Sequence, residues 1–314
     1  PNIVLIVSDD QGYGDISCYD HPQEVKTPNL DRIAAAGSRF TSGYSSAYVC
    51  APSRAGLMTG RYQQRFGFYS GGDSRIGLPR SEVTIAEHLQ EAGYVTGVFG
   101  KWHLGLEKPY HPLSRGFDEF YGFLGHGAHD YFELKKDDDH NSIWRNWERI
   151  DDTGYLTDNL GREAASFIQR HKEEPFFLYL PFHAVHTPLV ERDLWLERAA
   201  HIEDEERQLY AAAVAHLDHA VGRIAQALVE EQRRGLSELL GKDGELTAAV
   251  PEDDSSADEL GRELCAAIAE GAYDQGRSRE QLLAWLRTDV QARLRINDPV
   301  FLERNARRAK SPLL

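Results

Sequence analysis

Cysteine is scarce in this chain, whose 314 residues include only Cys18, Cys50 and Cys265. Three cysteines so far apart do not make a disulfide framework, although one pair stays open. No apolar run approaches the ~20 residues that cross a bilayer, so we expect no membrane span. Basic residues are outnumbered, with 35 Lys and Arg against 50 Asp and Glu and a net charge of −15. We therefore expect no nucleic-acid partner, because binding to nucleic acid depends on neutralising its phosphates.

Histidine and tyrosine are almost absent from the last third of the chain. All 13 histidines lie at or before His219, and Tyr273 is the single tyrosine after it. The stretch 241–258 is acidic, contains serines and carries Pro251, a composition typical of a loop or linker. This change in composition predicts a core at 1–226, a linker at 227–256 and a helical segment of unknown function at 257–314.

Apolar runs and helical patterns alternate within the core. Buried strands are predicted at 3–7, 94–99 and 176–182, where the apolar runs are continuous. Helical patterns separate these strands, at 28–36, at 85 to about 92 and at 204 to about 229. Alternation of this kind predicts the α/β class, with a mostly parallel sheet between two layers of helices.

Polar side chains follow each predicted strand. The first strand leads into Asp9 and Asp10, the second into Lys101 and His103, and the third into His183 and His186. Sites in open α/β sheets form outside the carboxyl ends of the strands, so we expect these groups to meet at one edge of the sheet.

Asp9 and Asp10 are adjacent carboxylates directly after a buried strand. Two carboxylates held close together need a cation or a proton between them. Hard oxygen ligands of this kind suit Ca²⁺ or Mg²⁺ better than Zn²⁺. The alternative is a polar turn in which Ser8 or Asp10 caps the segment that follows.

Cys50 opens the run Cys-Ala-Pro-Ser-Arg, which continues as Ala-Gly-Leu-Met-Thr-Gly. Pro52 near the start and Gly60 near the end predict a short helix. A thiol at a helix N-terminus beside Arg54 has a stabilised thiolate, which favours a nucleophile. The alternative is a small buried hydrophobic residue without reactivity.

These segments together resemble the formylglycine-dependent sulfatases, an arylsulfatase-like family of the alkaline phosphatase superfamily. The similar segments cover roughly the first 225 residues in the family's order: 2–14, 27–37, 50–61, 100–105, 111–122, 183–189 and 210–224. The last ~90 residues do not match the family pattern. The resemblance implies an alkaline-phosphatase-like α/β sandwich, followed here by the C-terminal helical segment.

The resemblance also implies a sulfuric ester hydrolase acting on an aryl or carbohydrate sulfate. Cys50 would be oxidised to formylglycine by a formylglycine-generating enzyme, a partner during maturation. One hydroxyl of the hydrated aldehyde would attack the sulfate ester, and the other would then expel sulfate. Arg54 and Lys101 would hold sulfate oxygens, His103 would take a proton from the diol, and His186 would protonate the leaving oxygen. His183 has no matching family role and is expected to be structural.

The metal implied by the resemblance is Ca²⁺, with Mg²⁺ as the alternative, held by Asp9, Asp10 and the oxidised Cys50. The family supplies two further ligands from a later strand that ends in Asp-Asn-Gly. No apolar strand runs into Asp-Asn after Gln226 in this sequence, and Asn297-Asp298 has the reverse order. We therefore expect the core to lack that strand.

Two other functions are compatible with the same residues. A phosphonate or phosphodiester hydrolase can use the same fold, because its tetrahedral oxyanion has a similar size. A non-catalytic sulfatase-like protein with an incomplete metal site is the second alternative. The chain enters an apolar run at Ile3 with no charged segment or cleavage site before it, so we expect no signal peptide here. The resemblance implies a periplasmic or secreted location.

Overall fold

The computed structural model describes residues 1–19, 24–125, 131–132 and 141–240. Contacts within the chain divide it into one compact unit at 1–228 and another at 229–314. The helical segment predicted at 257–314 lies outside the described residues. No described helix is both long enough and apolar enough to cross a membrane.

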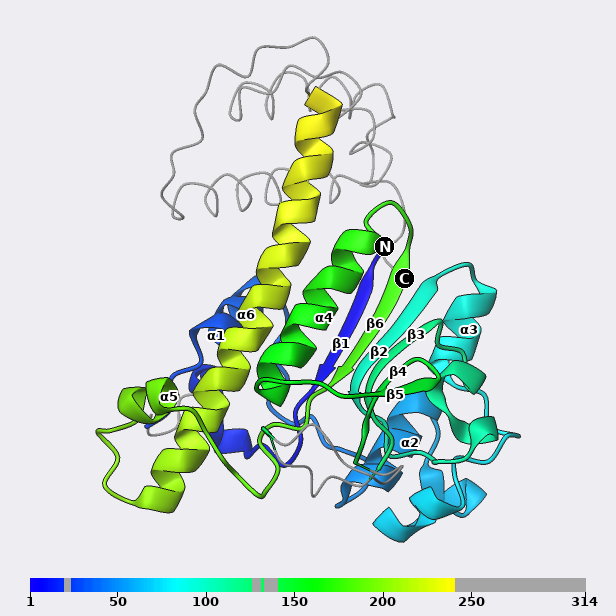
Figure 1. Cartoon of the computed structure of the whole chain (residues 1–314), viewed down its shortest axis with the longest axis horizontal. Coiled ribbons are helices and arrows are strands. Elements are labelled where there is room, and N and C mark those ends of the chain that lie inside the picture. The colour runs from blue at the N-terminus through cyan, green and yellow to red at the C-terminus, as the bar shows by residue number, and fades with distance from the viewer. Residues whose placement is uncertain (20–23, 126–130, 133–140, 241–314) are drawn as a thin grey trace. The chain divides into compact units, whose positions relative to one another are not determined.

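A single sheet of six strands runs through the described part of the first unit, in the order β1-β6-β2-β3-β4-β5 (Figure 1). The four parallel strands are β1 (Ile3–Val7), β6 (Phe176–Pro181), β2 (Val95–Lys101) and β3 (Glu119–Phe123). The short strands β4 (Ile143–Arg145) and β5 (Glu148–Ile150) extend the sheet in antiparallel fashion. The three predicted strands are therefore three neighbours, with their carboxyl ends at one edge.

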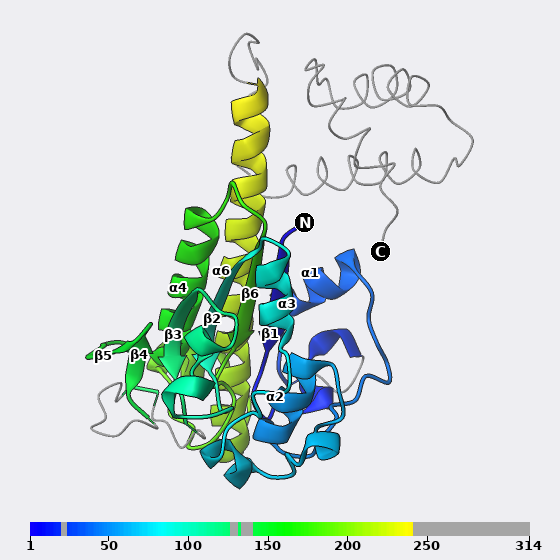
Figure 2. The same cartoon turned by 90° about the vertical axis from the view of Figure 1, so that its right-hand side faces the viewer.

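Helices cover both faces of this sheet (Figure 2). Alternate residues of β6 point to opposite faces, and Phe177 and Tyr179 belong to one buried cluster while Leu178 and Leu180 belong to another. The first cluster includes residues of α2 (Cys50–Thr59) and α3 (Ile85–Glu91). The second includes residues of α4 (Leu156–Arg170) and α6 (Glu205–Leu240). The predicted α/β sandwich is confirmed.

Several smaller elements complete the described chain. Helix α1 spans Pro28–Ala36 and α5 spans Asp193–Arg198. Short 3-10 helices lie at Tyr13–Asp15, Ser17–Tyr19, Gln63–Phe66, Gly71–Arg75, Lys108–Tyr110 and Pro112–Ser114.

The N-terminus of α1 is capped from a distant part of the sequence. The helix begins at Pro28 as predicted, but the preceding Thr27 makes no side-chain cap. The carboxylate of Asp218 on α6 accepts hydrogen bonds from the backbone N–H of Asn29 at 3.2 Å and of Leu30 at 2.8 Å. Since the first N–H groups of a helix have no partner within it, this carboxylate joins α1 to α6.

Helix α6 is longer than the sequence patterns predict. The pattern predicted a helix end near residue 229 and a linker from 227, whereas the helix continues to Leu240. Residues 227–240 contain no proline and consist mostly of Ala, Leu, Glu, Gln and Arg, which are strong helix formers. Helix propensity therefore extends the helix into a stretch that we assigned to the linker.

Candidate active site

Asp9 occupies the centre of the candidate site, two residues beyond β1. Its backbone N–H donates to the carbonyl of Ala184 at 2.9 Å, and its own carbonyl accepts from Val185 at 2.9 Å. These two bonds hold the residue beside the segment that follows β6. The side chain of Asp9 is almost completely buried.

Two buried cations face the carboxylate of Asp9. Lys101 Nζ lies 2.5 Å from Asp9 Oδ2, and Arg54 Nη2 lies 3.4 Å from Asp9 Oδ1. Burial raises the pKa of Asp9, but the charges of Arg54 and Lys101 outweigh burial and lower it below 3.8. One carboxylate with two cations leaves the group with an excess of positive charge.

Arg54 lies on α2, one turn after Cys50. Its Nη1 donates to the carbonyl of Lys101 at 2.9 Å and contacts the Tyr179 hydroxyl at 3.5 Å. The Nε atom is buried and has no acceptor among the described residues. Burial lowers the pKa of Arg54, but Tyr179, Asp9 and Cys50 together outweigh it and raise that pKa. Arg54 is therefore a fixed cation with one donor available to a ligand.

Cys50 is the first residue of α2, preceded by Val49 in an extended conformation. The thiol is half-buried and forms no disulfide. Cys50 and Arg54 are four residues apart on α2, a spacing that puts both side chains on the same face of the helix. The predicted helix, from Cys50 to Gly60 at its C-cap, is confirmed.

Lys101 is the last residue of β2 and follows a crowded glycine. A Cβ on Gly100 would lie 2.1 Å from the Pro181 carbonyl oxygen on β6. Gly122 on β3 pairs with Gly100, and a Cβ there would lie 2.0 Å from the Gly100 carbonyl oxygen. Real Cβ atoms do not approach backbone so closely, so the three strands meet here only because these positions are glycine. This packing sets the backbone position from which the Lys101 side chain extends.

Asp10 and His186 form a second contact at the same edge. His186 Nε2 lies 3.4 Å from Asp10 Oδ2, and the Tyr131 hydroxyl donates to the His186 carbonyl at 2.9 Å. Unlike Asp9, Asp10 is largely exposed, and its φ of 59° puts it in the left-handed region. The two adjacent carboxylates therefore point to different surroundings, one buried and one open.

The other two histidines of the predicted edge are buried. His103 follows β2, has a φ of 58°, and donates its backbone N–H to the Leu124 carbonyl at 3.2 Å. His183 stacks on His186 with ring centroids 5.3 Å apart and contacts the Tyr131 ring at 5.0 Å. The packing of His183 fits the structural role expected for it.

The structure thus brings Asp9, Arg54 and Lys101 into direct contact, beside Cys50, and joins Asp10 to His186 separately. Two residues at this edge were not predicted. Tyr179 was assigned to the strand as an apolar position, although the alternation along β6 places it on the α2 face. Gln11, next to the acidic pair, has a buried Nε2 without an acceptor among the described residues.

The donor set at this edge suits a hard cation only in part. Asp9 and Asp10 supply carboxylate oxygens, which is the chemistry that Ca²⁺ and Mg²⁺ prefer. Within the described ranges, no group of three or more His, Cys, Asp or Glu side chains could hold a metal ion. A Ca²⁺ takes ~6–8 oxygens, so these two residues would supply a minority of its ligands.

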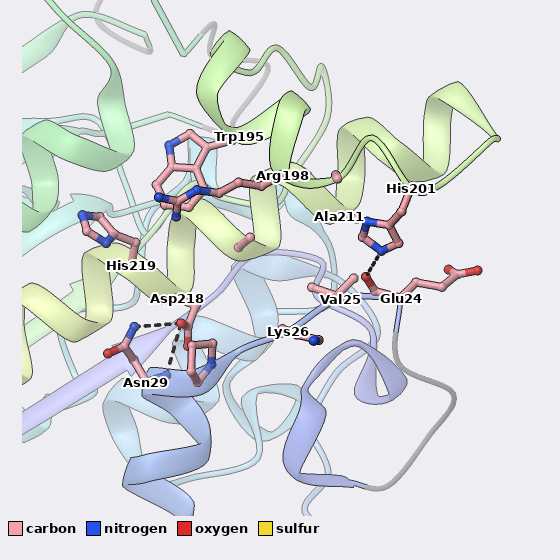
Figure 3. Close-up of a pocket in the computed structure, with 13 residues that line it drawn as sticks. Glu24, Val25, Lys26, Asn29, Trp195, Arg198, His201, Ala211, Asp218 and His219 are labelled. Atoms are coloured by element: carbon pink, nitrogen blue, oxygen red, sulfur yellow. Dashed lines mark hydrogen bonds between the residues drawn. The ribbon is translucent and has the colours of Figure 1, made fainter. Parts of the chain in front are cut away.

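A cavity of about 670 Å³ lies at a different place, among α1, α5 and α6 (Figure 3). None of the predicted site residues lines it. The cavity is therefore separate from the cluster around Asp9.

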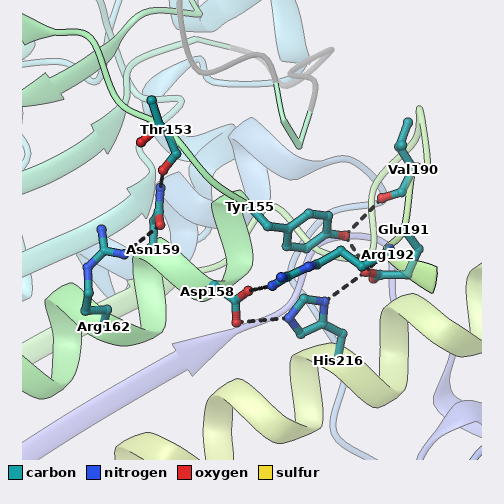
Figure 4. A network of polar contacts seen from close by, with 9 residues as sticks. All are labelled: Thr153, Tyr155, Asp158, Asn159, Arg162, Val190, Glu191, Arg192 and His216. Carbon is teal, nitrogen blue, oxygen red and sulfur yellow. Dashed lines mark hydrogen bonds and ion pairs between the residues drawn. The ribbon is translucent and has the colours of Figure 1, made fainter. Parts of the chain in front are cut away.

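His216 on α6 anchors the segment that follows His186 (Figure 4). Its Nδ1 lies 2.9 Å from Glu191 Oε1, and its Nε2 lies 3.1 Å from Asp158 Oδ1 on α4. Asp158 also accepts from Arg192 Nη1 at 2.6 Å. The imidazole therefore links α4, α6 and the segment at 191–192.

The ring of His216 lies between two aromatic faces. Its centroid is 4.6 Å from that of Tyr155 and 4.7 Å from that of Trp195, with both pairs stacked. Burial lowers the pKa of His216, but the hydrogen bonds and charges of Asp158 and Glu191 outweigh it and raise the pKa above 6.5. The folded protein therefore favours the protonated imidazolium.

Comparison with known proteins places this arrangement in a family. Residues 1–235 match the family model described as Sulfatase, and residues 222–301 match a model described as a domain of unknown function (DUF6285). The N-acetylgalactosamine-6-sulfatase of Rattus norvegicus is 34% identical over 314 residues, covering 91% of this chain and 56% of the relative. Arylsulfatase A of Homo sapiens is 54% identical over 127 residues, covering 39% of this chain and 25% of the relative.

Comparison with solved structures finds a related fold. The crystal structure of Ps i-CgsB in complex with k-i-k-neocarrahexaose is 37% identical, has a TM-score of 0.70, and covers 74% of this chain and 56% of that chain. The likeness concerns the α/β core described above. Because the family model matches 235 of the 314 residues, the chain belongs to the sulfatase family. It spans about half the length of the curated relatives it matches.

Replacing Asp9 by Asn should destabilise the protein strongly. The Lys101 ammonium and the Arg54 guanidinium would stay buried without a carboxylate, and breaking a buried ion pair costs ~3–5 kcal/mol. Urea unfolding at pH 7 measures this cost. Asp10→Asn is the matched control, and should cost less than ~1 kcal/mol because Asp10 is exposed. Equal stability of the Asp9→Asn protein and the unchanged protein would contradict the buried cluster.

Replacing His216 by Phe should destabilise the protein more at low pH than at high pH. Phe keeps the stacking but removes the charge from between two carboxylates. The folded-state pKa of His216 is raised, so its stabilisation is complete below pH 6.5 and is lost as the pH rises through the folded-state pKa. Unfolding free energies at pH 5.5 and pH 9 measure the difference. His88→Phe, at an exposed position of α3, is the control; a pH-independent cost for His216→Phe would contradict the imidazolium.

Proposed function

We propose that this chain is a sulfuric ester hydrolase that cleaves an aryl or carbohydrate sulfate after Cys50 is converted to formylglycine. The observation that carries the proposal is the buried excess of positive charge around Asp9, beside a cysteine at the start of a helix. Fixed cations in a buried site stabilise an oxyanion better than mobile water does. A sulfate ester brings such an oxyanion to the nucleophile.

The relatives support this substrate class. Two of them are named N-acetylgalactosamine-6-sulfatase and arylsulfatase A, and a solved relative carries a neocarrahexaose, a carbohydrate. The proposal therefore covers sugar and aryl esters. Maturation would need a formylglycine-generating enzyme as a partner, and the family resemblance favours a periplasmic or secreted location.

Each residue of the cluster has a part in the proposed reaction. The overall reaction consumes one water and one sulfate ester, and yields the free alcohol, sulfate and a proton. Arg54 would donate its available Nε–H to a sulfate oxygen, and Lys101 would share its ammonium between Asp9 and the substrate. Both cations are held by the protein before the substrate arrives, so little reorganisation is needed.

The two histidines would move protons on opposite sides of the sulfate. His103 would take a proton from the hydrated aldehyde of residue 50, and His186 would give one to the leaving alcohol oxygen. His186 Nε2 lies 3.4 Å from Asp10 Oδ2, so a carboxylate stands beside the proposed acid. The hydrated aldehyde keeps a second hydroxyl, which allows sulfate to leave without a further nucleophile.

Asp9 and Asp10 would hold a divalent cation, Ca²⁺ or Mg²⁺, together with an oxygen of modified residue 50. When bound, the cation would add positive charge that polarises the sulfate. Both carboxylates follow the end of β1, and their oxygens are of the kind that such a cation prefers.

Protein co-expressed with the formylglycine-generating enzyme should hydrolyse a chromogenic aryl sulfate. Cys50→Ala should lower kcat/KM by at least about a thousandfold, because it removes the nucleophile. The mass of the tryptic peptide 40–54 shows whether the cysteine has been converted. Assays with and without added Ca²⁺ measure the metal dependence.

Three outcomes would count against the proposal. An unmodified cysteine in every preparation would remove the formylglycine. A confirmed aldehyde without turnover would favour the non-catalytic sulfatase-like protein. Faster cleavage of the matching aryl phosphodiester or phosphonate would favour that hydrolase activity instead.

A further inference from the structure

The cavity among α1, α5 and α6 has an apolar floor and a charged rim. Val25, Ala199 and the almost fully buried Trp195 belong to the floor. Lys26 and Arg198 belong to the rim and are exposed (Figure 3). A volume of about 670 Å³ is within the ~300–1,000 Å³ typical of small-molecule sites.

Both carboxylates that line the cavity already have partners. Asp218 accepts two hydrogen bonds from the N-terminus of α1 and a third from Asn29 Nδ2 at 2.8 Å. Glu24 Oε2 accepts from Arg207 Nε at 2.7 Å. Both carboxylates are therefore already engaged by the protein before any ligand enters.

The basic groups of the rim, in contrast, have no oppositely charged partner among the described residues. The guanidinium of Arg198 lies over the ring of Trp195, with Cζ 4.4 Å from the centroid. Neither Arg198 nor Lys26 pairs with a carboxylate within the described part of the chain. An arginine that packs over an indole keeps N–H groups available to a ligand.

His219 lines the same cavity, beside Trp195. Its ring lies 5.3 Å from that of Trp195. Burial is the largest cause of the lowered pKa of His219; the charges of His216, Arg223 and Arg198 lower it further, and Asp158 raises it. The lining holds two cations, Lys26 and Arg198, and two carboxylates, Glu24 and Asp218, and the carboxylates already accept hydrogen bonds from the protein.

We propose that this cavity is a second binding site, which takes a small organic anion. The sulfate, phosphate or carboxylate group of the ligand contacts Arg198, Lys26 adds positive charge elsewhere on the rim, and a ring-sized body covers the apolar floor. A bare inorganic ion would fill a small part of the volume and leave the floor in water. The ligand's body is a sugar or an aryl ring, since both present apolar C–H or ring surfaces of suitable size.

Titration of the His219 ring signal by NMR tests the site directly. The protein is the Cys50→Ala variant, so binding is measured without turnover and independently of the proposed hydrolysis. The signal is assigned by its loss in His219→Gln. Galactose 6-sulfate and p-toluenesulfonate are the ring-bearing anions, and inorganic sulfate and unmodified galactose are the comparison compounds.

We expect both ring-bearing anions to shift the signal and to raise the pKa of His219, because a nearby anion favours the charged imidazole. Galactose should leave it unchanged, and inorganic sulfate should bind more weakly. Arg198→Ala should raise the Kd by about tenfold, the loss typical of one charge-assisted hydrogen bond. Lys26→Ala should weaken binding in the same direction. Arg65→Ala removes an equal charge at an exposed position outside the cavity, and should have no effect.

The relative affinities of the two ring-bearing anions identify the body that the cavity prefers. Galactose binding as tightly as its sulfate would overturn the proposal, because charge would then play no part. Inorganic sulfate binding as tightly as either ring-bearing anion would overturn the ring-sized ligand. An unchanged Kd in both Arg198→Ala and Lys26→Ala, with native circular dichroism, would overturn the site.

Discussion

The buried carboxylate of Asp9 is the interaction on which the arrangement of this core depends. It is the one negative group that Lys101 and Arg54 share, and it joins the end of β1 to the end of β2 and to α2. Two cations buried together would otherwise repel, with a large cost for their lost hydration. The close packing at Gly100 positions Lys101, and the hydroxyl of Tyr179 contacts Arg54.

Much of this arrangement follows from local sequence. The continuous apolar runs predicted the strands, the helical pattern from residue 85 predicted α3, and parallel strands brought Asp9 and Lys101 to one edge. The contact of Arg54 with Asp9 was not predictable in the same way, because it depends on how α2 packs against the sheet. The predicted end of α6 was wrong because the change in composition suggested a linker from residue 227. The helix formers of that stretch instead continue the helix to Leu240.

Both proposed sites of this acidic chain take an anion, one at Arg54 and the other at Arg198. The distance over which charge attracts an anion therefore matters. A net charge of −15 gives no long-range attraction for an anion, and charges beyond ~8–10 Å are screened at physiological salt. Selectivity must therefore come from fixed contacts at short distance. Arg54 is fixed by a backbone carbonyl and a carboxylate, whereas Arg198 packs over an aromatic face. The first arrangement suits a buried reaction, and the second suits reversible binding at a more open surface.

The pairing of β1 has a consequence for the order of assembly on the ribosome. Its only strand partner within the described sheet is β6, with Ile3 beside Phe177. Helix α1 likewise depends on a residue made much later, Asp218, which caps its N-terminus. At ~5–20 residues per second, roughly 10–30 s separate the synthesis of β1 from that of its partner. During that interval the first strand has no place in a sheet. The carboxylate that organises the core is thus made before the strand that completes its surroundings.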